Sequence, residues 1–256
     1  MTESDCIIPI GTRIDPTVTI GRGVVFAGEG IVIRANAKLD AACVIGEGVT
    51  IGQGAWVRTG AVVLGSVPAN AIIEGNPARV VGYLNRAEFD GRPAPRLVEA
   101  LTLDNAERPA RIPLDVGGAA VYLMRRVVDA RGSLTVGEVP TEVPFSPARY
   151  FAVFDVPSAE LRGEHAHKRC QQFMICVHGS CRVLLDDGHR RCEVLLDRPD
   201  MAVFMPEMIW GTQYRYSRDS VLLVFASRPY EPEDYLRTYE EFLSERHRVQ
   251  SIQIDG

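Results

Sequence analysis

Residues 31–63, IVIRANAKLDAACVIGEGVTIGQGAWVRTGAVV, carry an aliphatic residue at every sixth position. Neither a helix, with 3.6 residues per turn, nor an alternating strand, with a period of two, repeats at six. A triangular β-solenoid does, with one short strand and one tight corner per hexad, and glycine eases the corners. The anchors occupy two registers, and we expect them to point inward in about three to four coils: Ile8, Ile14, Ile20, Phe26 and Val32, then Ile33, Leu39, Ile45, Ile51, Val57 and Val63.

These hexads resemble the hexapeptide-repeat, left-handed β-helix acyltransferases. The resemblance covers residues 8–83 and includes a closing segment, VPANAIIEGNPARVVGY, at 67–83. It implies a trimeric left-handed parallel β-helix over residues 1–85 and acetyl-CoA-dependent N-acetyltransfer, in which Arg79 would contact a coenzyme A phosphate. Members often use a histidine as base, but all five histidines here lie at or beyond position 165. A trimerisation stalk without activity is therefore the alternative.

Residues 86–112 break the repeat and contain Pro93, Pro95 and Pro109. We interpret them as a connector, with a short helix expected over 96–103. From 113 to 256 the pattern becomes a series of short apolar segments, which favours an antiparallel sandwich or barrel. The stretch EPEDYLRTYEEFLSERH, at 231–247, is predicted to be a helix that places Tyr235, Tyr239 and Phe242 on one face. The fold class is thus all-β, with one helix near the C-terminus.

Composition excludes several classes of protein. The chain has 256 residues, a formal net charge of -5 and 46% hydrophobic residues, so a basic nucleic-acid-binding face is not expected. No apolar run approaches the roughly 20 residues that a membrane helix needs, and MTESDC does not resemble a signal peptide. We expect a cytoplasmic protein without a membrane partner. The six cysteines include no C-x-x-C pair, so reduced, mostly buried thiols are expected.

The segment RGEHAHKRCQQ, at 162–172, concentrates polar residues between two predicted strands. On a strand, His165 and His167 point to the same face. Two imidazoles side by side suit a reaction that removes a proton from one carbon and returns one to its neighbour. A metal site and a purely structural pair of histidines are the two alternatives.

Three segments in order make a more specific resemblance: RGEHAHKRCQQFMICVHGSCRVLLDDG at 162–188, MPEMIW at 205–210 and DSVLLVFASRPYEPEDYLRTYEEF at 219–242. Together they resemble the cupin-type sugar 3,4-ketoisomerases, which act on nucleotide-linked, usually dTDP-linked, 4-keto-6-deoxyhexoses. The similarity runs from Asp129 to Phe242. It implies a cupin domain, a double-stranded antiparallel β-barrel or jelly roll, over residues 113–256, and fusions of this cupin to a hexapeptide acyltransferase occur in the family.

The resemblance implies a metal-independent isomerase without a cofactor. His165 and His167 would carry the acid and base work through an enediol, and the product would be the 3-keto isomer. Substrate contacts are implied for Arg149, Tyr150, Arg162, Lys168, Gln172 and Trp210. Cupins that bind metal have a Glu after the H-x-H motif and a distant His, whereas this chain has Gln171 and Gln172 and then Gly211 at those places, and amides are poor ligands for soft or borderline metals.

Two departures from the family pattern affect these assignments. Members often read R-V-Y-Y before the motif, but Arg149 is followed here by Tyr150, Phe151 and Ala152. Shifting a tyrosine by one residue turns it to the other face of the strand. The second departure is Gly211, where many members have a histidine.

We expect a homo-oligomer, with trimeric solenoids and paired cupins that together would make a hexamer. Two further hypotheses remain open: a non-catalytic trimeric module that binds a nucleotide sugar, and an N-acetyltransferase with a regulatory cupin.

Overall fold

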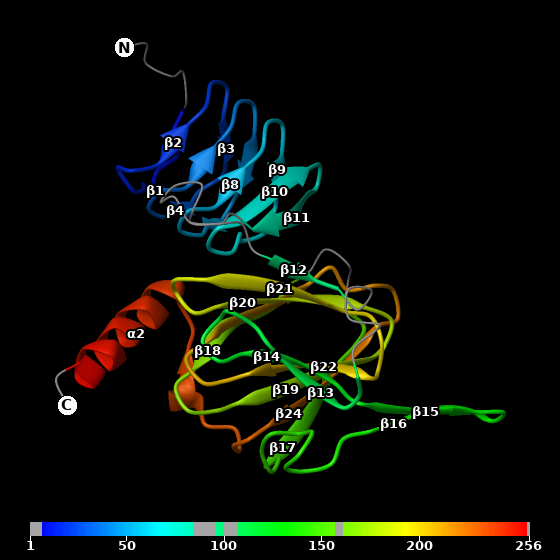
Figure 1. Ribbon diagram of the computed structural model, residues 1–256. Coiled ribbons are helices and arrows are strands. Elements are labelled where there is room, and N and C mark those ends of the chain that lie inside the picture. The colour runs from blue at the N-terminus through cyan, green and yellow to red at the C-terminus, as the bar shows by residue number, and fades with distance from the viewer. Residues whose placement is uncertain (1–6, 84–95, 100–106, 157–160, 255–256) are drawn as a thin grey trace. The chain divides into compact units, whose positions relative to one another are not determined.

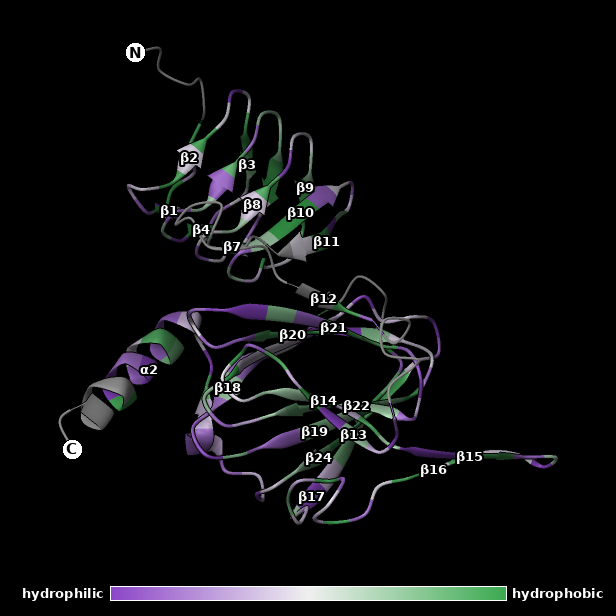
Figure 2. Ribbon diagram, in the orientation of Figure 1, coloured by the Kyte–Doolittle hydropathy of each residue, from purple (hydrophilic) through white to green (hydrophobic). Residues whose placement is uncertain are grey.

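The computed structural model describes residues 7–83, 96–99, 107–156 and 161–254 (Figure 1). The chain forms two compact units, residues 1–94 and 95–256. Each unit is described by itself below. Figure 2 shows hydrophobic residues along the strands of both units.

The N-terminal unit is a solenoid of short parallel strands. It contains β1 (Arg13–Ile14), β2 (Thr19–Ile20), β3 (Val25–Ala27), β4 (Val32–Ile33), β5 (Lys38–Leu39), β6 (Val44–Gly46), β7 (Thr50–Ile51), β8 (Trp56–Val57), β9 (Val62–Val63), β10 (Ala71–Gly75) and β11 (Ala78–Tyr83). These strands form three sheets, in the orders β1-β4-β7, β11-β10-β8-β5-β2 and β3-β6-β9. The last pair, β10 and β11, is antiparallel and ends the repeat. The triangular solenoid predicted from the hexads is confirmed.

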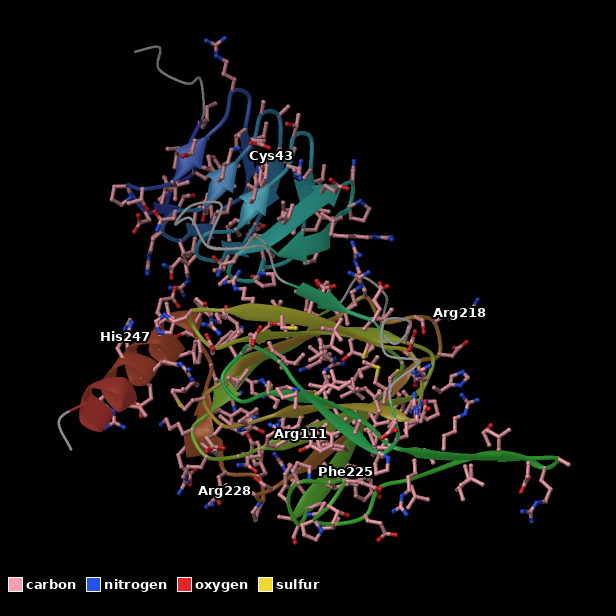
Figure 3. The ribbon with its side chains drawn as sticks, in the orientation of Figure 1. Cys43, Arg111, Arg218, Phe225, Arg228 and His247 are labelled. Atoms are coloured by element: carbon pink, nitrogen blue, oxygen red, sulfur yellow. The ribbon has the colours of Figure 1, made fainter. Side chains whose placement is uncertain are left out.

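Most predicted anchors fill the interior of the prism. Leu39, Ile45 and Ile51 are at most 1% exposed, and Cys43 is buried among them (Figure 3). Two anchors were assigned wrongly: Ile8 is 54% exposed, and Val32 is only half-buried while its neighbours Ile31 and Ile33 are buried.

The reason for the second error is one extra residue in the first coil. Ile14 pairs with Ile33, 19 residues later, and Ile33 pairs with Ile51, 18 residues later. The insertion lies between Phe26 and Ile33, where Gly30 adopts a φ of 70°. Glycine accepts this left-handed conformation without steric cost, so the longer corner leaves the register of the following strands intact.

The C-terminal unit is a barrel of two six-stranded sheets. One sheet has the order β12-β21-β20-β23-β18-β25 and the other β13-β14-β22-β19-β24-β17. The strands are β12 (Arg96–Val98), β13 (Ala110–Pro113), β14 (Ala120–Leu123), β17 (Arg149–Val153), β18 (Arg162–His167), β19 (Gln172–His178), β20 (Cys181–Asp186), β21 (Arg191–Leu196), β22 (Met201–Met205), β23 (Trp210–Tyr214), β24 (Val221–Ala226) and β25 (Tyr235–Leu236). A separate hairpin joins β15 (Arg125–Asp129) to β16 (Gly132–Val136). The two sheets enclose one apolar core that includes Leu123, Met174 and Val203.

The prediction of a helix over residues 96–103 is wrong for residues 96–98. Arg96–Val98 is strand β12, which pairs in parallel with β21. Val98 is buried in the barrel core, so the edge of β21 and the core override the local helical pattern. Residues 100–103 lie outside the described residues. Strand β13 also falls in the predicted connector, and it pairs with β14.

The C-terminal helix begins later than predicted. Residues 232–234 form a 3-10 turn, η2 (Pro232–Asp234), and β25 follows it; α2 (Tyr239–Ile254) starts only after that. Tyr239 and Phe242 do share a face, which packs on Trp210, and the Tyr239 hydroxyl donates to Asp186 over 2.7 Å. Tyr235 lies instead in β25, paired with His167 of β18. Pairing with the barrel therefore converts the expected first helical turns into part of a sheet.

Among the described residues, no helix is both long and apolar enough to span a membrane. Cys43, Cys170, Cys176, Cys181 and Cys192 are buried and are not joined in disulfides, which confirms the expectation for these five thiols. Cys6 lies outside the described residues.

Removing core volume should destabilise the solenoid. Ile45 is 0% exposed, so Ile45→Ala removes buried methyl groups and leaves a cavity; we expect a loss of about 2–5 kcal/mol in the free energy of unfolding. Urea unfolding followed by circular dichroism measures this change. The matched control is Ile10→Ala, because Ile10 is 87% exposed. Equal effects of the two substitutions would contradict the inward placement of Ile45.

Candidate active site

A bulge in β18 sets the position of the two histidines. The register between β18 and β23 shifts between Gly163 and His165, and Glu164 at the bulge has a φ of 54°. Gly163 has a φ of 81°, and a Cβ there would lie 2.6 Å from the carbonyl oxygen of Gly211. Only glycine fits this close approach. The bulge ends at His165, so the strand from His165 to His167 is regular and both side chains share one face, as predicted.

The tautomer of His165 follows from its hydrogen bond. Nδ1 of His165 lies 2.8 Å from the carbonyl oxygen of Gly163. A carbonyl oxygen only accepts, so Nδ1 carries the hydrogen and donates it. Nε2 of His165 then holds a lone pair, which is the form that a general base requires.

His167 is held from both sides of its ring. Nδ1 of His167 lies 2.9 Å from Oδ2 of Asp234, and both side chains are nearly inaccessible, at 1% and 3% exposed. The same carboxylate oxygen accepts from the backbone N–H of Cys170. On the other side, Nε2 of His167 lies 3.1 Å from Nε2 of Gln172. The Asp234 carboxyl group, which accepts through Oδ2, thus orients His167 with the hydrogen on Nδ1, and Gln172 donates to its Nε2.

Tyr235 connects the histidines to an arginine. Its ring centroid lies 4.9 Å from that of His165 and 4.3 Å from that of His167, and the two imidazoles are 4.9 Å apart. Nη2 of Arg149 donates to the Tyr235 hydroxyl over 3.2 Å. Nε of Arg149 is buried and has no hydrogen-bond partner in the described part of the chain. A guanidinium with an unused donor beside two imidazoles is suited to an anionic or carbonyl oxygen of a ligand.

Burial keeps both imidazoles neutral near pH 7. It lowers the pKa of His165 below the ordinary imidazole value, and the nearby Arg237 lowers it further against the opposing effect of the Gly163 carbonyl. The pKa of His167 falls to about 4, mainly through burial and then through His165, although Asp234 acts in the opposite direction. Neutral imidazoles can accept protons, so the pair is ready for base chemistry at neutral pH.

One group of side chains here has ligand atoms close enough for a metal ion. His167, Cys170 and Asp234 are all buried, and they offer ligand atoms within 4.8 Å of one another. This group uses the Asp234 side of His167 and does not include His165. Its ligand atoms already form hydrogen bonds within the protein: Asp234 Oδ2 accepts from His167 Nδ1 and from the backbone N–H of Cys170, and Cys170 Sγ donates to the carbonyl oxygen of Gln171.

The structure brings together some predicted substrate residues and separates others. Arg149, Gln172 and the two histidines converge. Tyr150 is 71% exposed on the opposite face of β17, while Arg149 and Phe151 take the inward positions, with the Arg149 guanidinium 5.5 Å from the Phe151 ring.

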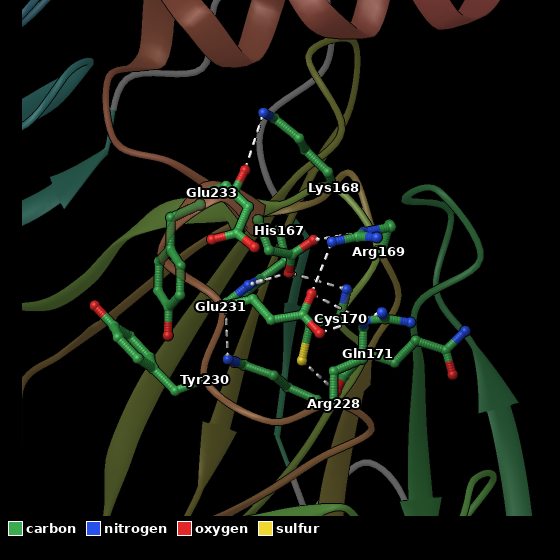
Figure 4. Close-up of polar contacts among 12 residues, drawn as sticks. His167, Lys168, Arg169, Cys170, Gln171, Arg228, Tyr230, Glu231 and Glu233 are labelled. Atoms are coloured by element: carbon green, nitrogen blue, oxygen red, sulfur yellow. Dashed lines mark hydrogen bonds and ion pairs between the residues drawn. The ribbon is translucent and has the colours of Figure 1, made fainter.

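The remaining predicted residues lie around or outside this group. Lys168 is exposed and donates to the carbonyl oxygen of Glu233 over 3.0 Å, and its side chain points away from His167 (Figure 4). Arg162 is exposed at the start of β18, and Trp210 packs under α2. Arg79 is exposed on β11 opposite Glu74 in the N-terminal unit.

Gly211 lies directly opposite His165 in the β18–β23 pair. A Cβ at position 211 would approach Sδ of Met205 to 2.7 Å. The side chain of Met205 therefore occupies the space that a histidine would need at this position.

Sequence reasoning missed Asp234, Tyr235 and Arg237. All three belong to the segment EPEDYLR at 231–237, which was expected to be helical. The proline, three acids and tyrosine within the five residues 231–235 were a signal of a turn rather than a helix, but only pairing with β18 places Asp234 beside His167.

The antiparallel barrel with an inward-facing imidazole pair defines a protein of the cupin class. The model of the family described as FdtA: WxcM-like, C-terminal matches residues 118–247, about half of the chain. The chain belongs to this family.

A curated relative, TDP-4-oxo-6-deoxy-alpha-D-glucose-3,4-oxoisomerase from Aneurinibacillus thermoaerophilus, is 40% identical over 122 residues, which are 48% of this chain and 88% of the relative. Among solved structures, the 3,4-ketoisomerase QdtA from Thermoanaerobacterium thermosaccharolyticum, as a double mutant in complex with TDP, superimposes with a TM-score of 0.51. It is 28% identical, and the match covers 52% of this chain and 97% of that one.

The solenoid has relatives of its own. A 2,3,4,5-tetrahydropyridine-2,6-dicarboxylate N-acetyltransferase from Staphylococcus aureus is 39% identical over 71 residues, which are 25% of this chain. The match spans only 30% of that relative. It confirms the resemblance of the N-terminal unit to hexapeptide acetyltransferases.

The buried, neutral state of His167 should make stability depend on pH. The unfolded chain binds a proton at the ordinary imidazole pKa near 6.5, whereas the folded pKa is about 4. Between these values the unfolded state binds more protons, so stability is full above pH 6.5 and is lost as pH falls toward 4. The difference corresponds to about 3 kcal/mol.

Urea unfolding at a series of pH values measures this dependence, and His167→Gln should make it shallower. His178→Gln is the matched control because His178 is exposed. A slope unchanged by His167→Gln would show that this imidazole is not the group responsible.

Proposed function

We propose that the C-terminal unit is an isomerase that converts a TDP-linked 4-keto-6-deoxyhexose to its 3-keto isomer. The relative in Aneurinibacillus bears the name of this reaction and is 40% identical. A variant of QdtA that is 26% identical to this chain, with a TM-score of 0.50, is described in complex with TDP-4-keto-6-deoxyglucose. In this chain, the strongest support for the proposal is the lone pair on His165 Nε2. The reaction begins when a neutral base removes a proton, and this nitrogen can accept one.

The isomerisation moves two hydrogens and changes no net oxidation state. The hydrogen on carbon 3 moves to carbon 4, and the hydroxyl hydrogen moves from oxygen 3 to oxygen 4. The carbon-4 ketone acidifies the carbon-3 hydrogen, which His165 removes to form an enediol; the same imidazolium then protonates carbon 4. Proton transfer by a positioned side chain contributes about 100- to 10,000-fold to such a step.

His167 handles the hydroxyl hydrogen in this proposal. Its Nδ1–H donates to Asp234, so the carboxylate stabilises the imidazolium when Nε2 accepts a proton. Gln172, which donates to Nε2, gives way to the sugar hydroxyl. This arrangement needs no metal ion and no cofactor: the chain's own imidazoles move every proton.

Arg149 supplies a hydrogen-bond donor for the substrate in this proposal. Its guanidinium is fixed by the Tyr235 hydroxyl and lies 5.4 Å from the centroid of the Tyr230 ring. The free Nε–H is available to the developing oxyanion at carbon 4, and hydrogen bonds aimed at such a charge are worth most inside a partly dry site. The proposal assigns no direct substrate contact to the other three predicted residues. Arg162 is exposed, Lys168 donates to the Glu233 carbonyl oxygen, and Trp210 packs on Tyr239 and Phe242 of α2.

Replacing the base should abolish most of the activity. We expect His165→Asn to lower kcat by at least about 100-fold, because a general base is lost, while His178→Asn at an exposed site leaves it near normal. TDP-4-keto-6-deoxyglucose in heavy water, followed by NMR, is the assay: a 3-keto product is expected from the wild type, and its carbon 4 carries deuterium wherever the His165 imidazolium exchanges with solvent before it returns the proton.

A wild-type protein that binds this sugar without forming product or exchanging hydrogen would be a binding module instead. Near-normal turnover by His165→Asn would remove His165 from the mechanism. A circular dichroism spectrum of the variant ensures that loss of rate is not loss of fold.

The N-terminal unit suggests a second candidate function, acetyl-CoA-dependent N-acetylation of an amino sugar. Its similarity to an N-acetyltransferase over 71 residues favours this reaction. Release of free coenzyme A from acetyl-CoA with 3-amino-3-deoxyhexose acceptors linked to TDP tests it. We expect turnover that His165→Asn leaves unchanged and that Arg79→Ala weakens through a higher KM for acetyl-CoA. No coenzyme A release with any such acceptor would leave the solenoid with an assembly role.

A further inference from the structure

Three buried side chains behind the imidazole pair offer the ligand atoms of a zinc site. His167, Cys170 and Asp234 are all buried, and no two of their ligand atoms lie more than 4.8 Å apart (Figure 4). They supply an imidazole nitrogen, a sulfur and a carboxylate oxygen, which are the three kinds of atom that bind Zn²⁺ in proteins. The group uses Nδ1 of His167, which faces Asp234, whereas the reaction proposed above uses Nε2.

The spacing of these atoms is close to that around a tetrahedral ion. Bonds of about 2.0–2.3 Å to Zn²⁺ keep neighbouring ligand atoms roughly 3.3–3.6 Å apart. Nδ1 of His167 and Oδ2 of Asp234 are already 2.9 Å apart. The Cys170 thiol donates to the carbonyl oxygen of Gln171 over 3.4 Å, and a thiol is a weak donor. Turning this one side chain toward the other two therefore loses little.

One carboxylate oxygen of Asp234 is left over by the fold. Oδ2 accepts from His167 and from the backbone N–H of Cys170. Oδ1 is buried and has no hydrogen-bond partner in the part of the chain that the structure describes, although Nε of Arg169 lies 3.5 Å away. The Asp234 side chain is 3% exposed, and a buried polar atom without a hydrogen bond is costly. This oxygen thus points to a ligand, and a cation would satisfy it.

We propose that His167, Cys170 and Asp234 form an inhibitory zinc site. Zn²⁺ would bind Nδ1, Sγ and Oδ1, with Oδ2 or a water molecule in the fourth position. The metal replaces the hydrogen on Nδ1, so the neutral ring carries its hydrogen on Nε2. Cys170 releases its thiol proton to solvent and binds as the thiolate. One thiolate and one carboxylate then balance the two positive charges of the ion.

Zinc at this site would stop the proposed isomerisation. In that proposal Nε2 of His167 accepts the hydroxyl hydrogen of the sugar. When Nδ1 binds a metal ion, Nε2 already carries a hydrogen and has no lone pair with which to accept another. The inhibition therefore rests on the proposed function, whereas zinc binding rests on the geometry of the three side chains alone.

The exposed side chain beside this group is Arg169. It is 54% exposed; Nη2 lies 2.7 Å from Glu231, and Nε lies 3.5 Å from Oδ1 of Asp234 (Figure 4). Exposed ion pairs contribute little stability, so Arg169 can turn outward and admit an ion. Its positive charge opposes a cation at Oδ1, and removing that charge should strengthen zinc binding.

Cobalt spectroscopy on the full chain, without an affinity tag, tests the site independently of activity. Co²⁺ accepts the same ligands as Zn²⁺, and a cobalt–thiolate bond gives a charge-transfer band that added zinc removes by displacement. We expect one Co²⁺ per chain. Cys170→Ser should abolish the band and weaken zinc binding at least about 100-fold, because losing even a hydrogen-bond partner behind a ligand costs about 10- to 100-fold. Arg169→Gln should bind more tightly, a gain that a misfolded variant would not show.

Two variants serve as controls that should keep the band. Cys192→Ser is the matched substitution, because Cys192 is 3% exposed and Cys170 is 2% exposed. His165→Gln separates this site from one between the Nε2 atoms of the two histidines, because the proposed site does not include His165.

The isomerase assay measures the inhibition, and each variant is compared with its own metal-free rate. Saturating zinc should lower wild-type turnover at least about 100-fold, as expected when a proton acceptor is lost, and Cys170→Ser should keep its rate at the same zinc concentration. Full turnover by a zinc-saturated wild type would overturn the inhibition. If the metal-free wild type forms no product, the proposed function fails, and the cobalt band alone decides the zinc site.

A crystal soaked in zinc chloride gives a measurement that needs no variant. An anomalous peak within about 2.3 Å of Nδ1, Sγ and a carboxylate oxygen of the three residues is expected. The site would be overturned by the absence of this peak, a peak at the Nε2 atoms instead, no cobalt band in the wild type, a band that survives Cys170→Ser, weaker binding by Arg169→Gln, or a band lost from either control.

Discussion

The hydrogen bond between the buried Asp234 carboxylate and His167 organises the C-terminal unit. It joins residues 67 positions apart along the chain, and it requires that the turn Pro232–Asp234 leave the expected helix and lie against β18. Once the turn is there, β25 pairs with Ala166 and His167, and the Tyr235 ring lies against both imidazoles. A carboxylate is costly to bury without a partner. The position of β25 and the orientation of the His167 ring therefore both depend on this one hydrogen bond.

Burial, more than any charged neighbour, determines the protonation state of the two imidazoles. Burial is the largest influence on the pKa of both histidines, and it opposes the protonated form. Arg149 and Arg237 act in the same direction on one imidazole each, while Asp234 only moderates the effect on His167. A neutral imidazole beside an arginine combines a proton acceptor with an oxyanion partner, which proton transfer next to a ketone requires.

The two units illustrate two ways of encoding a β fold. In the solenoid, strands β1 to β9 pair with strands 18 or 19 residues away. One repeated position therefore fills the interior, and the repeat can be recognised in the sequence. In the barrel, β18 pairs with β23 and with β25, and no local sequence pattern predicts which strands will pair. The errors divide accordingly: in the solenoid Ile8 and Val32 were wrongly assigned as inward anchors, and in the barrel the segments 96–98 and 231–238 were assigned to helices.

The repeat, the strand-rich second half and the placement of His165 and His167 on one face could all be predicted from the amino-acid sequence, because periods of six and two are properties of the backbone. The sequence also indicated that a tyrosine of the family pattern is lost or shifted by one residue, although Tyr150 itself was expected to contact the substrate and lies on the exposed face of β17. The packing of the folded chain was needed to show which nitrogen of His165 holds the lone pair, that Asp234 accepts from His167, and that Lys168 and Trp210 contact other parts of the protein. Those facts depend on contacts between residues up to 67 positions apart and on how deeply each side chain is buried, and neither quantity is a property of any local stretch of chain.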